Sequence, residues 1–256
     1  MSSVQLAPST SEIIDRHYDN LADNYDLFLK YSPDFTRRLT RKMIEKLQLR
    51  EDDRLVDLGG GTGIYAVDIL EQVPLRQPVL LVDYSGAMLA RAPDDPRLEP
   101  LEMGGLEFAC REGRYDKILI KETVHHIEDR ARLFAELHER LSPGGRLLLV
   151  HIPPQIDYPL FRAAIERSLG WHADPDQLVR HLEASGFAVE REMFTYRHRL
   201  PKEVYFRMVR ARYMSLISSF SEQELEEGLA EMAATHAGSE VLEFDDRFDM
   251  ITGIKA

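Results

Sequence analysis

The sequence predicts a doubly wound α/β fold built on a mostly parallel sheet. Short apolar runs of strand length recur along residues 54–152, and helical patterns lie between them. A turn with four glycines in five positions directly follows the first of these runs. Parallel strands are covered on both faces and joined by crossover helices, so unbroken apolar runs that alternate with helices favour this fold.

The predicted elements alternate in the order that the fold requires. The expected strands cover residues 54–58, 78–83, 115–120 and 145–152. The expected helices between them cover residues 63–73, 85–92 and 130–145, the last stopped by Pro-Gly-Gly. In an open sheet of this kind, ligands bind at the carboxyl ends of the strands.

The last third of the chain departs from strict alternation. Residues 187–200 and 247–256 alternate like strands, and we expect two antiparallel strands at the sheet edge. Residues 153–182 and 201–238 read as helical insertions, which we expect to form a cap over the ligand site.

Composition and charge exclude several classes of partner. The formal net charge of -12 repels the phosphate backbone of nucleic acids. Cys110 is the one cysteine, which excludes internal disulfides and thiolate metal clusters. No run reaches the about 18 apolar residues of a membrane span, and the start of the chain lacks an export signal. We therefore expect a cytoplasmic protein without a nucleic-acid or membrane partner.

The glycine turn at residues 59–63 is typical of a place where bare backbone approaches a ligand. It joins a strand that ends near Asp57 to a helix, so backbone N–H groups and a helix N-terminus come together. The dinucleotide fingerprint G-x-G-x-x-G would need glycine where Ile64 stands. The spacing D-x-G-x-G-x-G therefore opposes nicotinamide-dependent oxidoreduction, which we keep as a third hypothesis.

An acidic residue stands at the end of the next predicted strand. Asp83 follows Gly63 by 20 residues, and a carboxylate there can accept hydrogen bonds from both hydroxyls of a ribose. Tyr84 and Met88 are placed to pack against the base. The pattern predicts a nucleoside ligand.

Four stretches stand in a characteristic order: "VDLGGGTG", "LLVDYSGAML", "RYDKILIKETVHHIED" and "LSPGGRLLLV". They resemble the class I S-adenosylmethionine-dependent methyltransferases, specifically the small-molecule methyltransferase-domain group, over roughly residues 50–152. The resemblance implies a Rossmann-like seven-stranded sheet and S-adenosyl-L-methionine as cofactor. It further implies that the ribose is bound by Asp83 and the adenine by Tyr84. The amino-acid end of the cofactor would be bound by Asp57, Gly59, Gly61 and Gly63.

Two further stretches bear on the cofactor. The amino-terminal "HYDNLADNYD" is similar to the helix that closes the pocket in this group and puts Tyr25 near the methionine moiety. Family members usually carry Asp-Ala after the third strand, whereas this chain reads "LEMGGLEFA". Backbone groups and apolar contacts around Gly104 and Leu106 are then expected to hold the adenine.

The resemblance also suggests the domain organisation. We expect one methyltransferase domain over residues 1–256, with residues 50–152 as the cofactor-binding core and residues 11–49 as an amino-terminal helical cover. The two helical insertions would then form the substrate cap.

Catalytic candidates follow the fourth strand. Methyl transfer from a sulfonium needs alignment, and it needs a base only when the acceptor must lose a proton. Lys121, Glu122, His125 and His126 lie at the carboxyl edge of the sheet. We expect His125 or His126 to be the base, since histidine titrates near neutral pH, and Lys121 and His126 to contact the cofactor. His151 ends the next strand and is a third candidate base, and the spacing of these histidines predicts no metal site.

Substrate selection is assigned to the insertions. The stretch at residues 201–220 is rich in Tyr, Phe, Met and Arg, and Arg207, Arg210 and Tyr213 are its expected substrate contacts. The predicted function is methylation of an O, N or C atom of a small organic metabolite, with specialised metabolism as the expected setting. The alternative is a non-methylating cofactor-binding protein, either pericyclase-like or a regulatory subunit. Monomer and homodimer both stay open.

Overall fold

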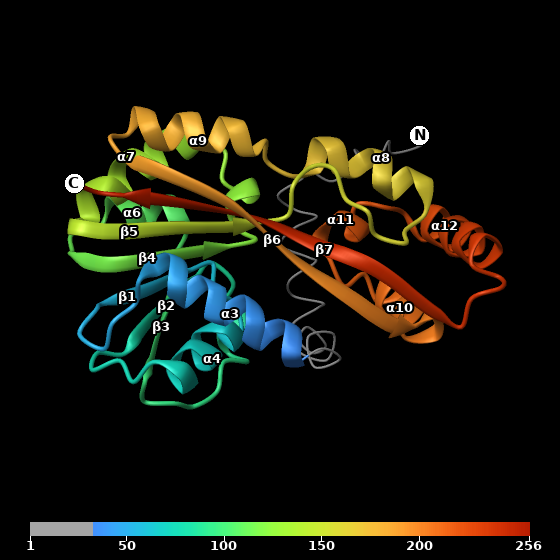
Figure 1. Cartoon of the computed structure of the whole chain (residues 1–256), viewed down its shortest axis with the longest axis horizontal. Coiled ribbons are helices and arrows are strands. Elements are labelled where there is room, and N and C mark those ends of the chain that lie inside the picture. The colour runs from blue at the N-terminus through green and yellow to red at the C-terminus, as the bar shows by residue number, and fades with distance from the viewer. Residues whose placement is uncertain (1–32) are drawn as a thin grey trace, which may run out of the picture.

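The computed structural model describes residues 33–256 and confirms the doubly wound α/β fold (Figure 1). One seven-stranded sheet has the strand order β3-β2-β1-β4-β5-β7-β6. The strands are β1 (Leu55–Leu58), β2 (Val79–Asp83), β3 (Leu98–Glu102), β4 (Tyr115–Lys121), β5 (Leu141–His151), β6 (Ala188–Pro201) and β7 (Val241–Ile254). Strands β1 to β5 are parallel, and β7 runs antiparallel to both of its neighbours.

Helices cover both faces of the sheet. They are α3 (Pro33–Leu47), α4 (Ile64–Gln72), α5 (Gly86–Leu89), α6 (Gly105–Cys110), η1 (Val124–His126), α7 (Arg130–Arg140), α8 (Arg162–Trp171), α9 (Pro175–Ala184), α10 (Lys202–Arg210), α11 (Ser215–Ser218) and α12 (Glu222–Thr235). One hydrophobic cluster contains the apolar side chains of α3 and α4, and a second contains those of α6, α7 and α9. The central strands therefore read as unbroken apolar runs because both of their faces are buried.

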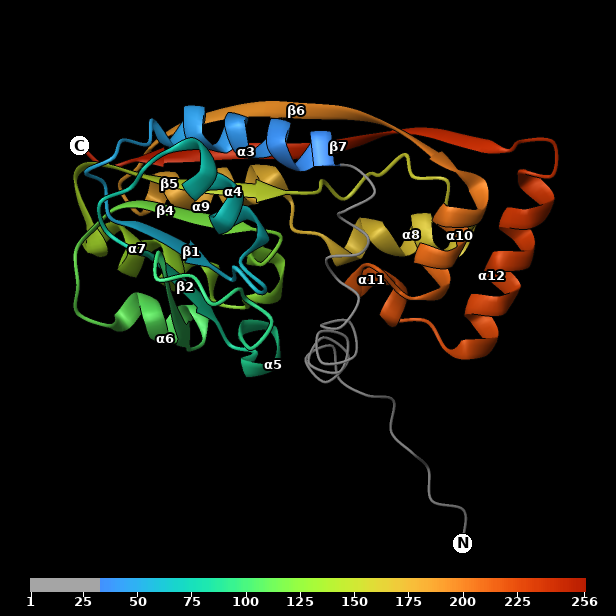
Figure 2. The same ribbon diagram turned by 90° about the horizontal axis from the view of Figure 1, so that it is seen from below.

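Strands β6 and β7 form a long two-stranded ribbon. They pair from Ala188 opposite Ile254 to Pro201 opposite Val241. Strand β5 pairs with β7 only as far as Asp249, so the rest of the ribbon extends beyond the sheet (Figure 2). The two predicted antiparallel strands thus exist, but only β6 of the two is an edge strand, because β7 lies between β5 and β6.

Four helices, α8, α10, α11 and α12, gather at the far end of this ribbon, and we call them the cap (Figures 1 and 2). Phe161, just before α8, fits against α12 at Gly228, where a Cβ atom would lie 2.5 Å from the Phe161 ring. The first hydrophobic cluster runs from α3 and α4 into the cap without a break.

Three sequence expectations need correction. Helix α9, within the predicted insertion 153–182, lies on the sheet beside α7 rather than in the cap. Its position follows from topology, since β6 runs in the direction of β5 and such a connection needs a crossover helix. Helix α7 ends at Arg140 rather than at residue 145. Helix α3 packs on α4 and β5 rather than over the carboxyl edge, and residues 11–32 of the predicted cover lie outside the described residues.

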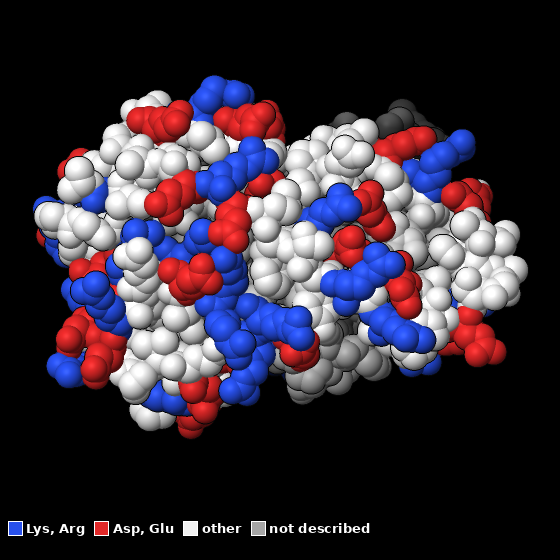
Figure 3. Space-filling model, viewed as in Figure 1, with Lys and Arg blue, Asp and Glu red and all other residues white. Residues whose placement is uncertain are grey.

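Charged side chains of both signs are interspersed over the face shown in Figure 3, with Lys and Arg concentrated near α3. Helix α3 carries Arg37, Arg38, Arg41, Lys42 and Lys46. Part of this charge is neutralised, because Lys42 and Lys46 both form ion pairs with Glu192 of β6. In the described part of the chain no helix is both long and apolar enough to cross a membrane.

Candidate active site

The glycine turn between β1 and α4 is fixed by backbone hydrogen bonds to β2. The N–H groups of Gly59 and Gly60 donate to the carbonyl oxygen of Val82 at 2.7 and 3.2 Å. Gly59 and Gly61 have φ angles of 79° and 55°, in the left-handed region that favours glycine. A Cβ atom on Gly59 would lie 2.1 Å from Oγ1 of Thr123. A side chain is therefore sterically excluded at Gly59.

Asp83 and Gly61 form a corner between the glycine turn and the end of β2. The Gly61 N–H donates to Oδ2 of Asp83 at 2.9 Å, and the Ser85 N–H donates to Oδ1 at 2.9 Å. Burial raises the pKa of Asp83, although these backbone hydrogen bonds oppose the rise. A Cβ atom on Gly61 would lie 3.0 Å from Cε of Met88 and 3.9 Å from Oδ2 of Asp83. The missing side chain leaves this corner accessible to a ligand.

A cavity of about 580 Å³, including its open mouth, lies over this corner. The cavity is lined by Asp57, Gly59, Gly60, Gly61, Ile64, Tyr65, Asp83, Tyr84, Met88, Lys121, Glu122, Thr123 and His126. These residues come from the carboxyl ends of β1, β2 and β4, where ligands bind in open α/β sheets.

Asp57 and Lys121 set the electrostatics of the cavity. Asp57 is 3% exposed, and burial raises the pKa of its carboxyl to about 7, while the Lys121 ammonium opposes the rise. Nζ of Lys121 lies 4.5 Å from the centroid of the Tyr65 ring and 5.4 Å from that of Phe248. An added positive group beside Asp57 would favour its ionised form.

Glu122 follows β4 in an unusual backbone conformation. Its φ angle is 54°, although it is not glycine. Its Oε1 accepts a 2.6 Å hydrogen bond from the N–H of Ile152, at the end of β5. Burial raises the pKa of Glu122 to about 7, against the opposing effect of Lys121. Strained backbone held in this way concentrates at functional sites.

The residues of the cavity fit S-adenosylmethionine. The Asp83 carboxylate can accept from ribose hydroxyls, and the Asp57 carboxylate can accept from an ammonium group. Tyr84 is 40% exposed, and Met88, which also lines the cavity, is apolar and buried, so both offer surfaces to an adenine ring.

Most predicted cofactor residues line this cavity. Asp57, Gly59, Gly61, Asp83, Tyr84, Met88, Lys121 and His126 do so. Gly63 does not, and instead caps α4 with a φ angle of 74°. Gly104 precedes α6 and Leu106 packs against the second hydrophobic cluster, so neither is part of the lining. Tyr25 lies outside the described residues.

Of the three predicted catalytic histidines, His126 lines the cavity, whereas His125 and His151 do not. The His125 ring lies 3.9 Å from that of His126 and 5.5 Å from that of His172. His151 is fully buried, with Nδ1 2.8 Å from the Ile152 carbonyl oxygen. Burial lowers the pKa of His125, His151 and His172, the last to about 3. Within residues 33–256, no three His, Cys, Asp or Glu side chains are placed to hold a metal ion.

The predicted substrate arginines lie elsewhere. Arg207 and Arg210 line a surface groove between α10 and α12, and Arg210 forms an ion pair with Glu226 at 3.2 Å. Both side chains thus lie at the surface of the cap and are not part of the cofactor cavity. Tyr213 is placed differently, with its hydroxyl 3.3 Å from that of Tyr205 inside the cap.

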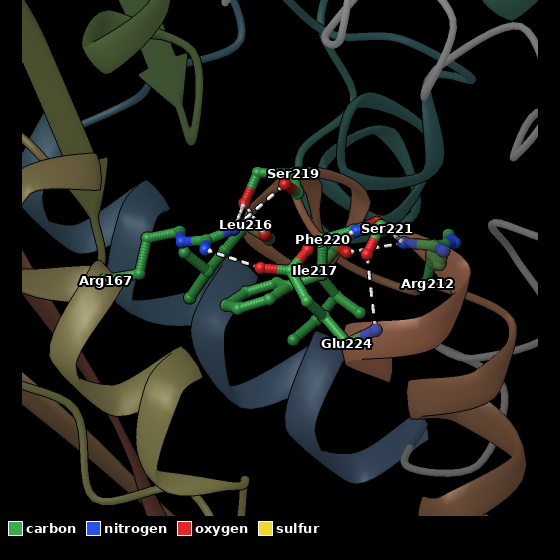
Figure 4. Close-up of polar contacts among 8 residues, drawn as sticks. All are labelled: Arg167, Arg212, Leu216, Ile217, Ser219, Phe220, Ser221 and Glu224. Atoms are coloured by element: carbon green, nitrogen blue, oxygen red, sulfur yellow. Dashed lines mark hydrogen bonds and ion pairs between the residues drawn. The ribbon is translucent and has the colours of Figure 1, made fainter. Parts of the chain in front are cut away.

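Two other arginines fix the α11 segment (Figure 4). Arg212 donates to the carbonyl oxygens of Ile217 at 2.8 Å and Phe220 at 2.7 Å. Arg167 donates to the Ser219 carbonyl oxygen at 2.9 Å, and its guanidinium lies 3.5 Å from the centroid of the Phe220 ring. Arginine in this part of the sequence therefore indicates structural hydrogen bonding as well as surface charge.

Tyr65 and Thr123 line the cavity although they were not predicted as site residues. Tyr65 belongs to an amphipathic helix pattern, where an aromatic residue reads as core. Thr123 adjoins the predicted Lys121-Glu122 pair, and this proximity was the available signal.

Comparison with known proteins agrees with this geometry. The family model described as "Methyltransferase domain" matches residues 28–192. The chain is 25% identical to demethylmenaquinone methyltransferase of Thermus thermophilus over 70% of this chain and 94% of that protein. It is 30% identical to trans-aconitate 2-methyltransferase of Pseudomonas aeruginosa over 58% of this chain and 56% of that protein, so this match spans about half of the relative.

Solved structures share the fold at low sequence identity. A protein of Anabaena variabilis described as a methyltransferase from an antibiotic biosynthesis pathway has a TM-score of 0.70 and 19% identity, covering 84% of this chain and 96% of its own. Phosphoethanolamine N-methyltransferase 2 of Haemonchus contortus, solved with S-adenosylhomocysteine, has a TM-score of 0.61 and 15% identity, covering 97% of this chain and 60% of its own. The family match, the relatives and the cofactor cavity agree: the chain belongs to the methyltransferase domain family and is a class I S-adenosylmethionine-dependent methyltransferase.

Proposed function

We propose that this protein methylates an O, N or C atom of a small organic metabolite, and that Glu122 takes up the proton that this acceptor atom loses. The observation that carries this proposal is the Glu122 carboxyl in the cofactor cavity, fixed at Oε1 by the Ile152 N–H. The compared proteins are named for different acceptors, so family membership alone does not choose one. Specialised metabolism and a cytoplasmic location remain parts of the proposal, as does the absence of a nucleic-acid partner.

The cofactor contacts are assigned by cavity position. Asp57, Gly59 and Gly61 are proposed to hold its amino-acid end, Asp83 its ribose, and Tyr84 and Met88 its adenine. Lys121 and His126 also line the cavity and are proposed to contact the cofactor at its reacting end. Gly104, Leu106 and Tyr25 stay predictions for the adenine and methionine ends.

Glu122 suits the role of base better than the buried histidines. Burial raises the pKa of its carboxyl to about 7, so it exchanges a proton near neutral pH. His125 and His151 lie outside the cavity lining, and burial lowers the pKa of each. A neutral imidazole whose protonated form is disfavoured is a weak proton acceptor.

The chemistry divides between cofactor and protein. S-adenosylmethionine, when bound, supplies a methyl group on a sulfonium leaving group. The acceptor atom gives its proton to Glu122, and the electron pair freed on that atom forms the new bond to the methyl carbon while the old bonding pair stays on sulfur. The cavity walls orient the acceptor and exclude water, which is where most of the rate of such a displacement arises.

Release of S-adenosylhomocysteine tests the proposal. The purified protein would be screened with small amines, phenols and β-dicarbonyl compounds, and the best acceptor used for variants. We expect Glu122→Gln to lower kcat by about 100-fold or more and to remove the rise of kcat through about pH 7. The exposed neighbour Glu128 supplies the control Glu128→Gln, which should behave as wild type.

Two results would contradict the proposal. A Glu122→Gln variant with unchanged kcat and pH profile would remove Glu122 from the role of base. Tight binding of S-adenosylhomocysteine without its release from any acceptor class would favour the non-methylating alternative.

A further inference from the structure

A second polar cluster lies where the β6–β7 ribbon leaves the sheet. At its centre is Asp246 of β7, whose side chain is 14% exposed. One of its carboxylate oxygens accepts a hydrogen bond from the Tyr158 hydroxyl, and the other lies 3.3 Å from Nε2 of His198. The assigned cofactor contacts do not use this carboxylate.

Aromatic rings pack against the two residues that contact this carboxylate. The Phe244 ring lies 5.2 Å from the rings of His198 and Tyr205 and 5.5 Å from that of Tyr158. Tyr205 and Tyr213 in turn share a hydroxyl contact at 3.3 Å. Burial, and in addition the charge of Asp246, raise the pKa of Tyr158, Tyr205 and Tyr213. We call these six residues the Asp246 cluster: Tyr158, His198, Tyr205, Tyr213, Phe244 and Asp246.

Tyr65 connects the Asp246 cluster to the cofactor cavity. It lines the cavity, yet it is only 6% exposed, and its buried hydroxyl has no hydrogen-bond partner among residues 33–256. After burial, the charge of Asp246 is the largest influence that raises the pKa of Tyr65, followed by the charge of Glu122. The hydroxyl is therefore within electrostatic influence of both carboxylates, and it has no hydrogen-bond partner among residues 33–256. A buried hydroxyl left in this way destabilises the fold, and a ligand group that hydrogen-bonds to it would relieve that cost.

The surroundings of Tyr65 favour positive charge. The carboxylates of Asp246, Glu122, Asp57 and Asp68 all act on its hydroxyl. Within the described part of the chain, Lys121 is the cation that lies over its ring. Aromatic faces and buried carboxylates together stabilise an ammonium ion, and they repel a carboxylate or a phosphate.

We propose that the Asp246 cluster is the acceptor subsite and that the acceptor is an organic ammonium compound. The proposal rests on the proposed methyl-transfer function and narrows its acceptor to an amine. In the subsite, Asp246 binds the ammonium group while the rings of Tyr158, Tyr205 and Phe244 surround it. The Tyr65 hydroxyl accepts from the same ammonium group on the side of Glu122. A polycarboxylate acceptor is opposed by the same charges.

Matched probes separate charge from shape. The melting temperature of the protein saturated with S-adenosylhomocysteine would be measured with propylamine, 2-phenylethylamine and tryptamine, and with the alcohol and carboxylate of the same skeletons. We expect the amines to raise the melting temperature and the alcohols and carboxylates to leave it unchanged. A larger rise with the alcohols or carboxylates, or no rise with any amine, would overturn the ammonium subsite.

Two substitutions locate the effect. Asp246→Asn preserves the size of the side chain and should weaken binding of the best amine by about 30-fold or more, since the ammonium loses its charged partner. Asp245→Asn changes the neighbouring carboxylate, which forms ion pairs with Arg197 and Arg247 instead, and should keep the amine response. An amine response that survives in Asp246→Asn would move the subsite elsewhere.

Calorimetric binding of S-adenosylhomocysteine distinguishes the two proposals and checks the fold of each variant. If the wild-type protein binds S-adenosylhomocysteine but no amine, the ammonium subsite is wrong and the proposed function stands. If it binds amines but releases no S-adenosylhomocysteine with them in the presence of S-adenosylmethionine, the subsite stands and methyl transfer fails.

Discussion

At the scale of single residues, Gly61 offers a test with a matched partner in the same chain. Gly61 and Gly144 have φ angles of 55° and 73°, but a Cβ on Gly61 would enter the Met88–Asp83 corner, whereas one on Gly144 meets nothing within 4 Å. Alanine at either position should lower the free energy of unfolding by about 1–2 kcal/mol, the cost of left-handed backbone. Only Gly61→Ala should also weaken binding of S-adenosylhomocysteine, by tenfold or more, in calorimetric titration.

Equal cofactor affinities in the two alanine variants would show that the Met88–Asp83 corner does not take the sugar. The unfolding midpoint in urea supplies the stability comparison, and it separates a folding defect from a binding defect.

Residues were predictable where a strand end and a motif coincide. Asp57 and Asp83 follow buried strands at a fixed distance from the glycine turn, and both line the cavity. The histidines are predicted from residue type and position, yet His125 and His151 are absent from the cavity lining. The His125 ring lies 5.5 Å from that of His172, and Nδ1 of His151 lies 2.8 Å from the Ile152 carbonyl oxygen. Asp246 had no signal in the sequence, because its partners Tyr158 and His198 come from distant elements.

At the scale of elements, the α11 segment depends on arginine side chains. Arg212 supplies donors to two backbone carbonyl oxygens and is 25% exposed, whereas Arg210 makes an ion pair between side chains that are 60% and 52% exposed. Arg212→Ala should lower the free energy of unfolding by about 2–3 kcal/mol, because two carbonyl groups lose their donors. Arg210→Ala should cost less than about 1 kcal/mol.

Hydrogen exchange of the amides around Ile217 and Phe220 is the local measurement for this pair. It should accelerate in Arg212→Ala and not in Arg210→Ala. Loss of methyl transfer in Arg210→Ala, with stability unchanged, would restore Arg210 to the substrate site.

The sequence predicted the core strands of the sheet well and the ribbon poorly, for a physical reason. The central strands β1, β4 and β5 are buried on both faces, so their apolar runs are unambiguous. The first half of β7, from Val241, pairs with β6 outside the sheet and carries charged residues, so only the half from residue 247 onward read as a strand. The sequence pattern of helix α9 shows an apolar face but does not indicate which surface that face covers. The prediction that α9 belongs to the cap was wrong for this reason.

At the scale of the whole molecule, buried neutral histidines make stability depend on pH. Burial lowers the pKa of His172 from 6.5 to about 3. Below about pH 6.5, His172 is therefore protonated in the unfolded chain but stays neutral in the folded state. The stability that His172 contributes is therefore present above that pH and is lost as the pH falls. Between pH 7.5 and 5.5 this loss amounts to about 1.4 kcal/mol.

A His172→Phe variant isolates this contribution. Its free energy of unfolding should fall by about 1.4 kcal/mol less than that of the wild type over the same interval, from urea titrations at both pH values. The comparison is needed because Asp57 and Glu122, whose pKa values burial raises to about 7, act in the opposite direction. Parallel pH dependence in the two proteins would mean that His172 is protonated in the folded state.

The β6–β7 ribbon also determines how the two ends of the molecule move. Fourteen residues in each strand, at about 3.3 Å per residue, give a beam roughly 45 Å long with one end clamped in the sheet. A paired ribbon of this kind has no single hinge residue. Any displacement of the cap would therefore be elastic bending and twisting spread along the length of the ribbon. The restoring force against such bending would be set by the twist of the two paired strands.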